Sequence, residues 1–298
     1  MNNKSLRNML ILVVVIAAAL GACLPDQKPA EDTSAAAIET AVAATLAAEE
    51  GSLPDTAAPV PSPTWTIHPT VTASPPEPDI LFRGVSFSYD PSLAEDINPA
   101  VLEAIDDEGG PWWSTPETVS FTFNGYALPD AFLDARIHVY NVAEFAEINP
   151  TVGERLATLR QVLDAGDVND DRISMADLFN AAQFVRTKVA FVDFQNGSGV
   201  RFLSQYGQAY SAVGWPHLFY GFQGLTEDGQ YFISVIMPVN HPSLPHPDTV
   251  VIDEAFAENF LTYVAEKETS LQAQPDDSFQ PSLILLDQLV ASLLVESP

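Results

Sequence analysis

Hydrophobic and polar residues alternate in several short runs in the C-terminal three quarters of the chain. Val85, Phe87 and Tyr89 alternate with serines, and the runs at 119–123 and 136–140 have the same period of two. Successive side chains of a strand point to opposite faces of a sheet, so this period indicates strands that bury one face. We therefore expect a β-sheet in this part of the chain.

Two β-hairpins give the clearest structural signals. They comprise residues 185–206 and 218–239, with turns at Asn196-Gly197 and Asp228-Gly229. Such pairs adopt the positive φ that a tight turn requires. One strand of each hairpin is apolar on both faces, which predicts central strands with a layer on either side of the sheet.

Helical periodicity appears in four segments between and after these strands. Helices are predicted from Pro150, around 175–184, after an N-cap at Asp253 and from Pro281. Antiparallel strands with helices between and after them are typical of the α+β class. We predict an antiparallel β-sheet with helices packed on it, arranged like an αβα sandwich.

The second hairpin also carries a family resemblance. Residues 224–232 (GLTEDGQYF) place a turn that ends in glycine before an aromatic strand. This stretch resembles the hairpin of PsbP-like αβα sandwich domains. The resemblance implies the same three-layer fold and no catalytic residues.

The N-terminal residues have a different pattern. Lys4 and Arg7 precede an apolar run at 9–20, which meets the small residues Gly21 and Ala22. The run is too short for a transmembrane helix, which needs about 20 residues, but it has the length of a secretory signal core.

The sequence Leu20-Gly21-Ala22-Cys23 that follows the apolar run resembles the lipobox of bacterial lipoproteins. The resemblance implies cleavage between Ala22 and Cys23, a diacylglycerol on the Cys23 thiol, and an anchor on the extracytoplasmic face of the cell membrane. Apart from this covalent lipid, no cofactor is expected. An ordinary secretory signal with a cysteine at its edge is the alternative.

Residues 23–79 are rich in Ala, Pro, Thr, Ser and Glu and contain few large apolar residues. Such a segment cannot offset the entropy of ordering itself, so we predict a disordered tether. The expected organisation is a signal peptide at 1–22, a lipid-anchored tether at 23–79 and one α+β domain at 80–298. This layout is similar to that of uncharacterised extracytoplasmic lipoproteins.

The net charge of the chain argues against some classes of binding partner. The chain has 12 Lys and Arg against 40 Asp and Glu, a net charge of −28. Such a field repels phosphates, so nucleic acid is not expected as a partner, and the membrane is expected to be bound through the lipid alone. With a single cysteine the domain has no internal disulfide.

Two segments could hold a metal ion. Asp167, Asn169 and Asp171 open like a calcium loop, although Arg172 stands where that loop requires glycine. His241 and His246 lie close enough in sequence to ligate zinc or copper. The alternatives are a polar connection between two helices and a rigid proline-containing surface loop.

A ligand could be held by the few unusual residues of the domain. Arg201 lies on a predicted strand and could bind a carboxylate or pair with an acid such as Asp193. Trp112, Trp113 and Trp215 could form a recognition surface or pack as loop anchors.

No coherent catalytic set appears in the sequence. We expect a non-catalytic binding or accessory module that acts on an envelope protein or a small ligand. A secreted hydrolase or metal-dependent enzyme whose site forms only in the fold is one alternative. A structural component of the envelope is the other.

Overall fold

The computed structural model describes residues 77–106, 114–178, 181–246 and 249–296. These ranges fall within one compact unit, Thr72–Pro298. The predicted signal peptide, cleavage site and lipidated Cys23, nearly all of the predicted tether, and Trp112 and Trp113 lie outside the described residues. Within the described ranges, no helix is both long and apolar enough to cross a membrane.

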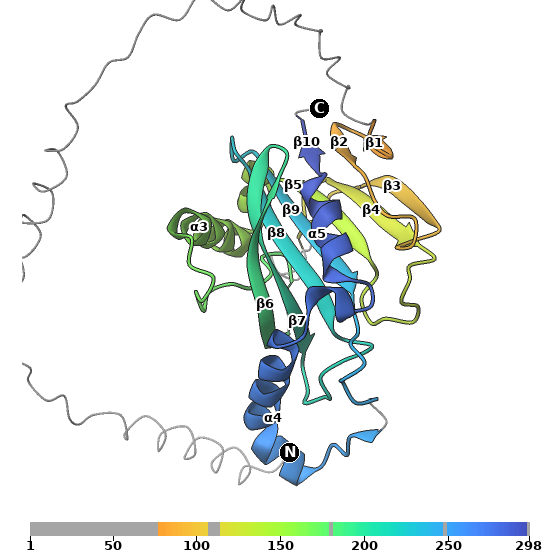
Figure 1. Ribbon diagram of the computed structural model, residues 1–298. Coiled ribbons are helices and arrows are strands. Elements are labelled where there is room, and N and C mark those ends of the chain that lie inside the picture. The colour runs from red at the N-terminus through yellow and green to blue at the C-terminus, as the bar shows by residue number, and fades with distance from the viewer. Residues whose placement is uncertain (1–76, 107–113, 179–180, 247–248, 297–298) are drawn as a thin grey trace, which may run out of the picture. The chain divides into compact units, whose positions relative to one another are not determined.

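A seven-stranded sheet, antiparallel throughout, forms the centre of the described unit (Figure 1). Its order is β3 (Asp96–Leu102), β4 (Thr118–Asn124), β5 (Arg136–Asn141), β9 (Tyr231–Pro238), β8 (Phe219–Thr226), β7 (Gly197–Gly207) and β6 (Ala182–Phe194). The β6–β7 and β8–β9 hairpins are those predicted from the sequence.

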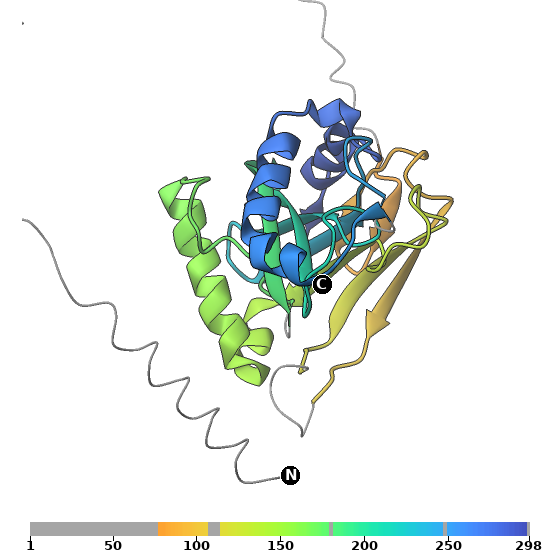
Figure 2. The same cartoon turned by 90° about the horizontal axis from the view of Figure 1, so that it is seen from below.

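Helices cover both faces of this sheet. Helices α2 (Val142–Ile148) and α3 (Pro150–Ala165) lie on one face, and α5 (Leu283–Ala291) lies on the other (Figure 1). Helix α4 (Glu254–Gln272) runs beside β6, while β3 and β4 lie at the far edge of the sheet (Figure 2). The predicted α+β class and its αβα layering are confirmed.

The strands divide their side chains between two cores, as the sequence pattern requires. On β8, Tyr220 and Phe222 pack toward α5, whereas Phe219 and Leu225 pack toward α3. All four side chains are almost completely buried. A strand that is apolar on both faces therefore occupies the middle layer of the sandwich.

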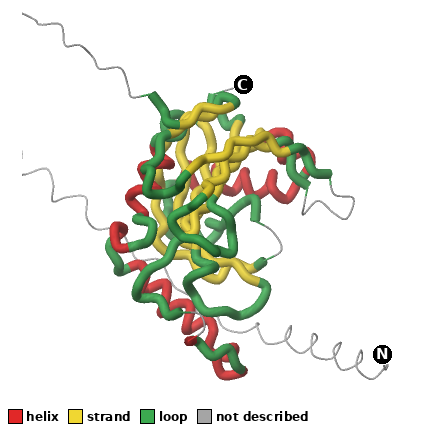
Figure 3. Tube along the Cα trace, turned by 90° about the vertical axis from the view of Figure 1, so that its right-hand side faces the viewer, coloured by secondary structure: helices red, strands yellow, loops and turns green. Residues whose placement is uncertain are grey.

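A second, three-stranded sheet joins distant parts of the chain. It contains β1 (Ile80–Phe82), β2 (Val85–Phe87) and β10 (Leu294–Val295), and Val295 pairs with Val85. The described chain therefore begins and ends at the same place, at the top of Figure 3.

Side-chain caps mark the starts of three helices, and the cap predicted at Asp253 is among them. The Asn149 side chain accepts a hydrogen bond from the Val152 amide at 3.3 Å, directly before Pro150 at the first position of α3. Asp253 accepts from the Phe256 amide at 2.9 Å and begins α4. Ser282 caps α5, one residue after the predicted start at Pro281. Each cap satisfies a backbone donor that the first helical turn leaves free.

Two local predictions were wrong. The helix expected around 175–184 is absent from its described residues, because 175–178 are irregular and β6 begins at Ala182. The first hairpin turns at Gln195-Asn196, since Phe194 pairs with Gly197. Gly197 does not have positive φ, but a Cβ there would collide with the Phe194 ring and the Leu225 carbonyl. This glycine allows a close approach of strands rather than a turn.

Both edges of the large sheet are protected. Along β6, the outward amides of Arg186 and Lys188 donate to Glu268 Oε1 at 2.6 Å and to Gln272 Oε1 at 2.8 Å on α4. Pro99 lies within β3 at the other edge and lacks a backbone donor. Occupied donors and an edge proline both oppose the addition of a foreign strand.

Candidate functional site

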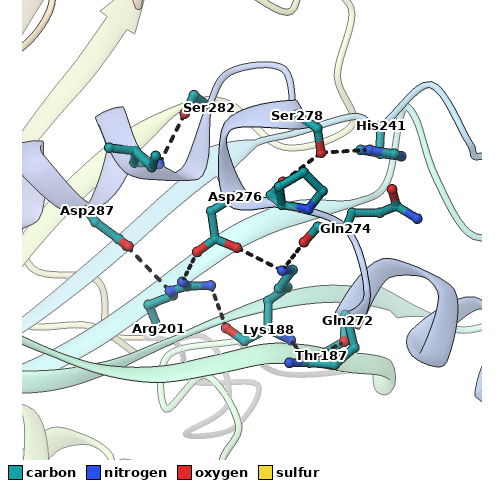
Figure 4. Close-up of polar contacts among 12 residues, drawn as sticks. Thr187, Lys188, Arg201, His241, Gln272, Gln274, Asp276, Ser278, Ser282 and Asp287 are labelled. Carbon is teal, nitrogen blue, oxygen red and sulfur yellow. Dashed lines mark hydrogen bonds and ion pairs between the residues drawn. The ribbon is translucent and has the colours of Figure 1, made fainter.

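Arg201, the candidate for carboxylate binding, lies in a buried ionic network (Figure 4). Its guanidinium, with the residue 5% exposed, donates to the Lys188 carbonyl at 2.6 Å and to Asp276 Oδ2 at 2.7 Å. Its Nε lies 3.4 Å from Asp287 Oδ1. The predicted pairing with Asp193 was wrong, because both acidic partners come from the segment around η3 (Asp276–Ser278) and α5.

Lys188 adds a second cation to this network. It lies where the β6–β7 register shifts, and its backbone has φ of 56°. Its Nζ donates to Asp276 Oδ1 at 2.8 Å and also to the Gln274 carbonyl. Asp276 therefore bridges both cations.

The charges of the network balance. Hydrogen bonds from Lys188 and the charge of Arg201 lower the pKa of Asp276, although burial opposes them. Burial raises the pKa of Asp287, which accepts a hydrogen bond from Tyr220 at 2.9 Å. Another carboxylate could reach Arg201 only by displacing Asp276, and breaking a buried pair is costly. We therefore interpret the network as a structural lock between β6, β7 and the C-terminal segment.

His241, a candidate metal ligand, lies beside this lock. Its Nδ1 lies 2.7 Å from Ser243 Oγ, and its Nε2 lies 3.0 Å from Ser278 Oγ. Ser278 in turn donates to the Pro275 carbonyl, which leaves Nε2 as the donor and Nδ1 as the acceptor. Burial and the charge of Lys188 lower the pKa of His241. The ring therefore anchors a loop as a neutral side chain.

The other metal candidates do not converge. Asp167 Oδ1 accepts from the Asn169 amide at 2.9 Å, and Arg172 forms an ion pair with Asp170 at 2.6 Å. The His246 ring lies 6.2 Å from Trp215, away from the partners of His241. In the described part of the chain, no three His, Cys, Asp or Glu side chains gather closely enough to hold a metal. Neither predicted metal site, including Asp171, thus receives a coordination shell.

Trp215 anchors one loop to another. Its Nε1 donates to the Pro129 carbonyl at 3.4 Å. Beside it, the Phe132 amide donates to the Pro216 carbonyl at 2.9 Å, so the β4–β5 and β7–β8 loops are joined. Of the two alternatives for Trp215, loop anchoring fits these contacts.

The joined loops form one side of an apolar cleft of about 650 Å³. Its lining residues come from the β4–β5 loop, the segment before β6, the end of β7 and the β7–β8 loop: Phe132, Leu133, Leu178, Ala181, Tyr206, Gly207, Gln208, Ala209, Tyr210, Ser211 and His217. In a strongly acidic chain, none of these described lining residues is Asp, Glu, Lys or Arg. Burial lowers the pKa of His217, which favours the neutral ring.

Aromatic rings surround the opening of the cleft. Phe132 is 68% exposed and lies 5.0 Å, centroid to centroid, from His217. Tyr210 is 51% exposed and lies 4.7 Å from Phe260 of α4. Exposed large rings around an apolar hollow are typical of recognition sites.

The cleft lies at the end of the sheet opposite to the three-stranded sheet. Leu133 precedes β5 and His217 precedes β8, whereas Asn141, at the other end of β5, lines a smaller cavity of about 150 Å³ together with Val295. The cleft therefore opens away from the place where the described chain begins.

No family model, curated protein or solved structure matches this chain. The functional argument therefore depends on the site itself.

Sequence reasoning missed this cleft. Phe132, Tyr206, Tyr210 and His217 lie in loops or at a strand end, where no periodicity singles them out. The available signal was large rings within polar stretches, as in Gln208-Ala209-Tyr210-Ser211. Only the fold shows that the separate loops meet.

Proposed function

We propose that this protein is a membrane-anchored extracytoplasmic lipoprotein whose domain binds a small, uncharged ligand with an apolar or aromatic body. The ligand lies in the cleft between Phe132 and Tyr210. The domain acts as a binding or accessory module and performs no covalent chemistry.

The observation that carries this proposal is the uncharged cleft with exposed rings at its mouth. A volume of about 650 Å³ falls within the range of about 300–1,000 Å³ typical of small-molecule sites. Apolar walls with a few polar groups, here Gln208, Ser211 and His217, select an apolar ligand and orient it.

The lipobox-like sequence at Leu20–Cys23 supports the anchor. The predicted tether at residues 23–79 would let the anchored domain meet its ligand away from the membrane.

Binding is tested by titrating the purified domain with N-phenyl-1-naphthylamine, an uncharged fluorescent probe. Phe132→Ala and Tyr210→Ala should each raise the Kd about 10-fold, because each ring contributes roughly 1–2 kcal/mol of apolar contact. Leu261→Ala is the matched control, since Leu261 is 83% exposed and lies outside the cleft lining. If the two cleft variants bind the probe as the wild type does, the cleft is not the site.

The anchor is tested separately by expressing the full chain in a bacterium. The wild type should fractionate with membranes and begin at a lipid-modified Cys23, as seen by mass spectrometry. Cys23→Ala should abolish the lipid mass and the membrane association. A mature chain that begins at another residue would contradict the proposed anchor.

A further inference from the structure

Residues 173–178 cross the α3 face of the sheet without regular secondary structure. Side chains hold this segment in place of a backbone ladder. Arg155 of α3 donates to the Leu178 carbonyl at 2.8 Å, and Tyr206 accepts from the Met175 amide at 2.9 Å. Gln223 accepts from the Ala176 amide at 3.0 Å. Because Leu178 lines the cleft, the position of this segment shapes the proposed ligand site.

Asp177 of this segment points toward the sheet. Its Oδ2 accepts a hydrogen bond from the Tyr140 hydroxyl at 3.3 Å, and Tyr140 lies 2.9 Å from His138 Nδ1. Its Oδ1 is shielded from solvent and has no hydrogen-bond partner among the described residues. The Tyr140 bond is long and Oδ1 has no described partner within hydrogen-bonding distance, so the Ser234 hydroxyl and the Asp177 amide nearby offset the burial of the carboxylate only in part.

Among the polar groups around Asp177, its own carboxyl is the one expected to change its protonation state. Burial raises the pKa of Asp177, against the opposing charge of Arg136 and the hydroxyls of Ser234 and Tyr140. Burial and Arg136 lower the pKa of His138 to about 3, so this ring stays neutral.

The tyrosines around Asp177 stay protonated. Burial and the nearby Asp177 raise the pKa of Tyr140. Burial also raises the pKa of Tyr206 from β7, against its hydrogen bond from Met175 and the charge of Arg155. His138 therefore stays neutral and both tyrosines keep their protons, so these neighbours do not share the proton that Asp177 gains.

We propose that Asp177 is a proton-operated latch on the cleft wall. When its carboxyl is neutral, residues 173–178 stay packed on the sheet and the cleft is closed on its ligand. When the carboxyl ionises, Oδ1 needs water, the segment moves outward with Leu178, and the ligand is released. Binding is therefore tight in mild acid and weakens as the pH rises.

The sign follows from linkage. An acid whose pKa is raised in the packed state favours packing while it is protonated, and this contribution is lost as the pH rises through the raised pKa. A decrease of about 5-fold or more in probe affinity across the transition corresponds to a typical coupling between two sites. This inference rests on the proposed ligand cleft, but the latch itself can be measured without a ligand.

The first test measures hydrogen exchange of residues 173–178 in the ligand-free domain from about pH 5 to about pH 8, corrected for intrinsic exchange. In the wild type, protection should fall as the pH rises. In Asp177→Asn, which cannot ionise, protection should stay constant. Tyr140→Phe removes a donor that favours the carboxylate, so the midpoint should move to higher pH.

Asp171→Asn is the matched control, because Asp171 is an exposed acid in the preceding loop. It should keep the wild-type profile. The latch is wrong if Asp177→Asn retains the pH dependence of the wild type, or if the protection of wild-type residues 173–178 does not change with pH.

The second test repeats the N-phenyl-1-naphthylamine titration across the same pH range. Wild-type affinity should fall with rising pH, and Asp177→Asn should bind tightly throughout. If the probe binds no variant while hydrogen exchange still depends on Asp177, the proposed ligand is wrong and the latch stands. If the probe binds all variants with one shared pH profile, the latch is wrong and the cleft stands.

Discussion

The two faces of the large sheet carry buried polar groups of opposite character. Toward α5, Arg201 and Lys188 meet Asp276 and Asp287, so charges cancel and most donors have acceptors. Toward α3, the carboxyl of Asp177 has only hydroxyl and amide neighbours on its Tyr140 side, and its Oδ1 has no hydrogen-bond partner among the described residues. A balanced network resists change, whereas an unbalanced group makes the surrounding structure depend on its protonation.

The difference between the two faces also indicates which buried polar groups are free to take part in ligand binding. Arg201 was one candidate ligand residue from the sequence, but both its terminal nitrogens donate within the chain. Asp177 was not among the candidate site residues, yet it adjoins a wall of the cleft.

Breaking the balanced network should produce the largest effect. Arg201→Met leaves Asp276 and Asp287 without a main partner, so the free energy of unfolding should fall by about 3–5 kcal/mol. Urea denaturation measures this loss. Arg172→Met is the control, because Arg172 is exposed in a surface loop and its pair with Asp170 should contribute far less to stability. Equal losses in both variants would show that the network is no lock.

Removing the Tyr140 hydroxyl from the hydrogen bonds on the α3 face should lower the free energy of unfolding by less than Arg201→Met does. Tyr140→Phe leaves the Asp177 carboxyl without its hydroxyl donor and should lower the free energy of unfolding by about 1–3 kcal/mol at neutral pH. Denaturation at mildly acidic pH should give a smaller loss, since a neutral carboxyl needs the donor less. A loss that does not vary with pH would show that the contribution of Tyr140 does not depend on the ionisation of Asp177.

Acid should reduce the stabilisation that Asp276 gives to the ionic network, which is the opposite of its effect on Asp177. The pKa of Asp276 is lowered in the fold, so its contribution is present above the unfolded value of about 4 and is lost as the pH falls through the folded value. The difference in unfolding free energy between wild type and Asp276→Asn should therefore shrink in acid. The difference in unfolding free energy between wild type and Asp177→Asn should change in the opposite direction. The variant should become more stable relative to the wild type as the pH rises.

The smallest effect is expected for the partner that the sequence suggested. In the described structure the acids beside Arg201 are Asp276 and Asp287, and the strand neighbour of Asp193 is Ser198. Asp193→Ala should change the free energy of unfolding by no more than about 0.5 kcal/mol, as measured by urea denaturation. A loss of several kcal/mol would mean that Arg201 depends on Asp193 in solution.

Local signals explain which parts of the fold could be predicted from the sequence. Helices α3 and α4 begin at Asn149 and Asp253, whose side chains satisfy nearby amides, and the β8–β9 hairpin turns at Gly229 with φ of 69°. Such signals act within a few residues, so sequence reasoning finds them.

Distant contacts explain the failures. Residues 175–178 take their shape from Arg155, Tyr206 and Gln223, which come from three other elements. The acids that pair with Arg201 lie 75 and 86 residues further along the chain. The cleft joins two loops and a connecting segment in the same way. No pattern along the sequence records that these segments meet.

The pairing of β10 with β2 has a consequence for the order of events in folding. Leu286, Leu289 and Val290 of α5 complete the core above the sheet, and Val295 closes against Val85. While a ribosome still holds this stretch, the nascent domain lacks part of its core and keeps an open apolar surface. Maturation into the native structure must then wait until synthesis has passed Val295.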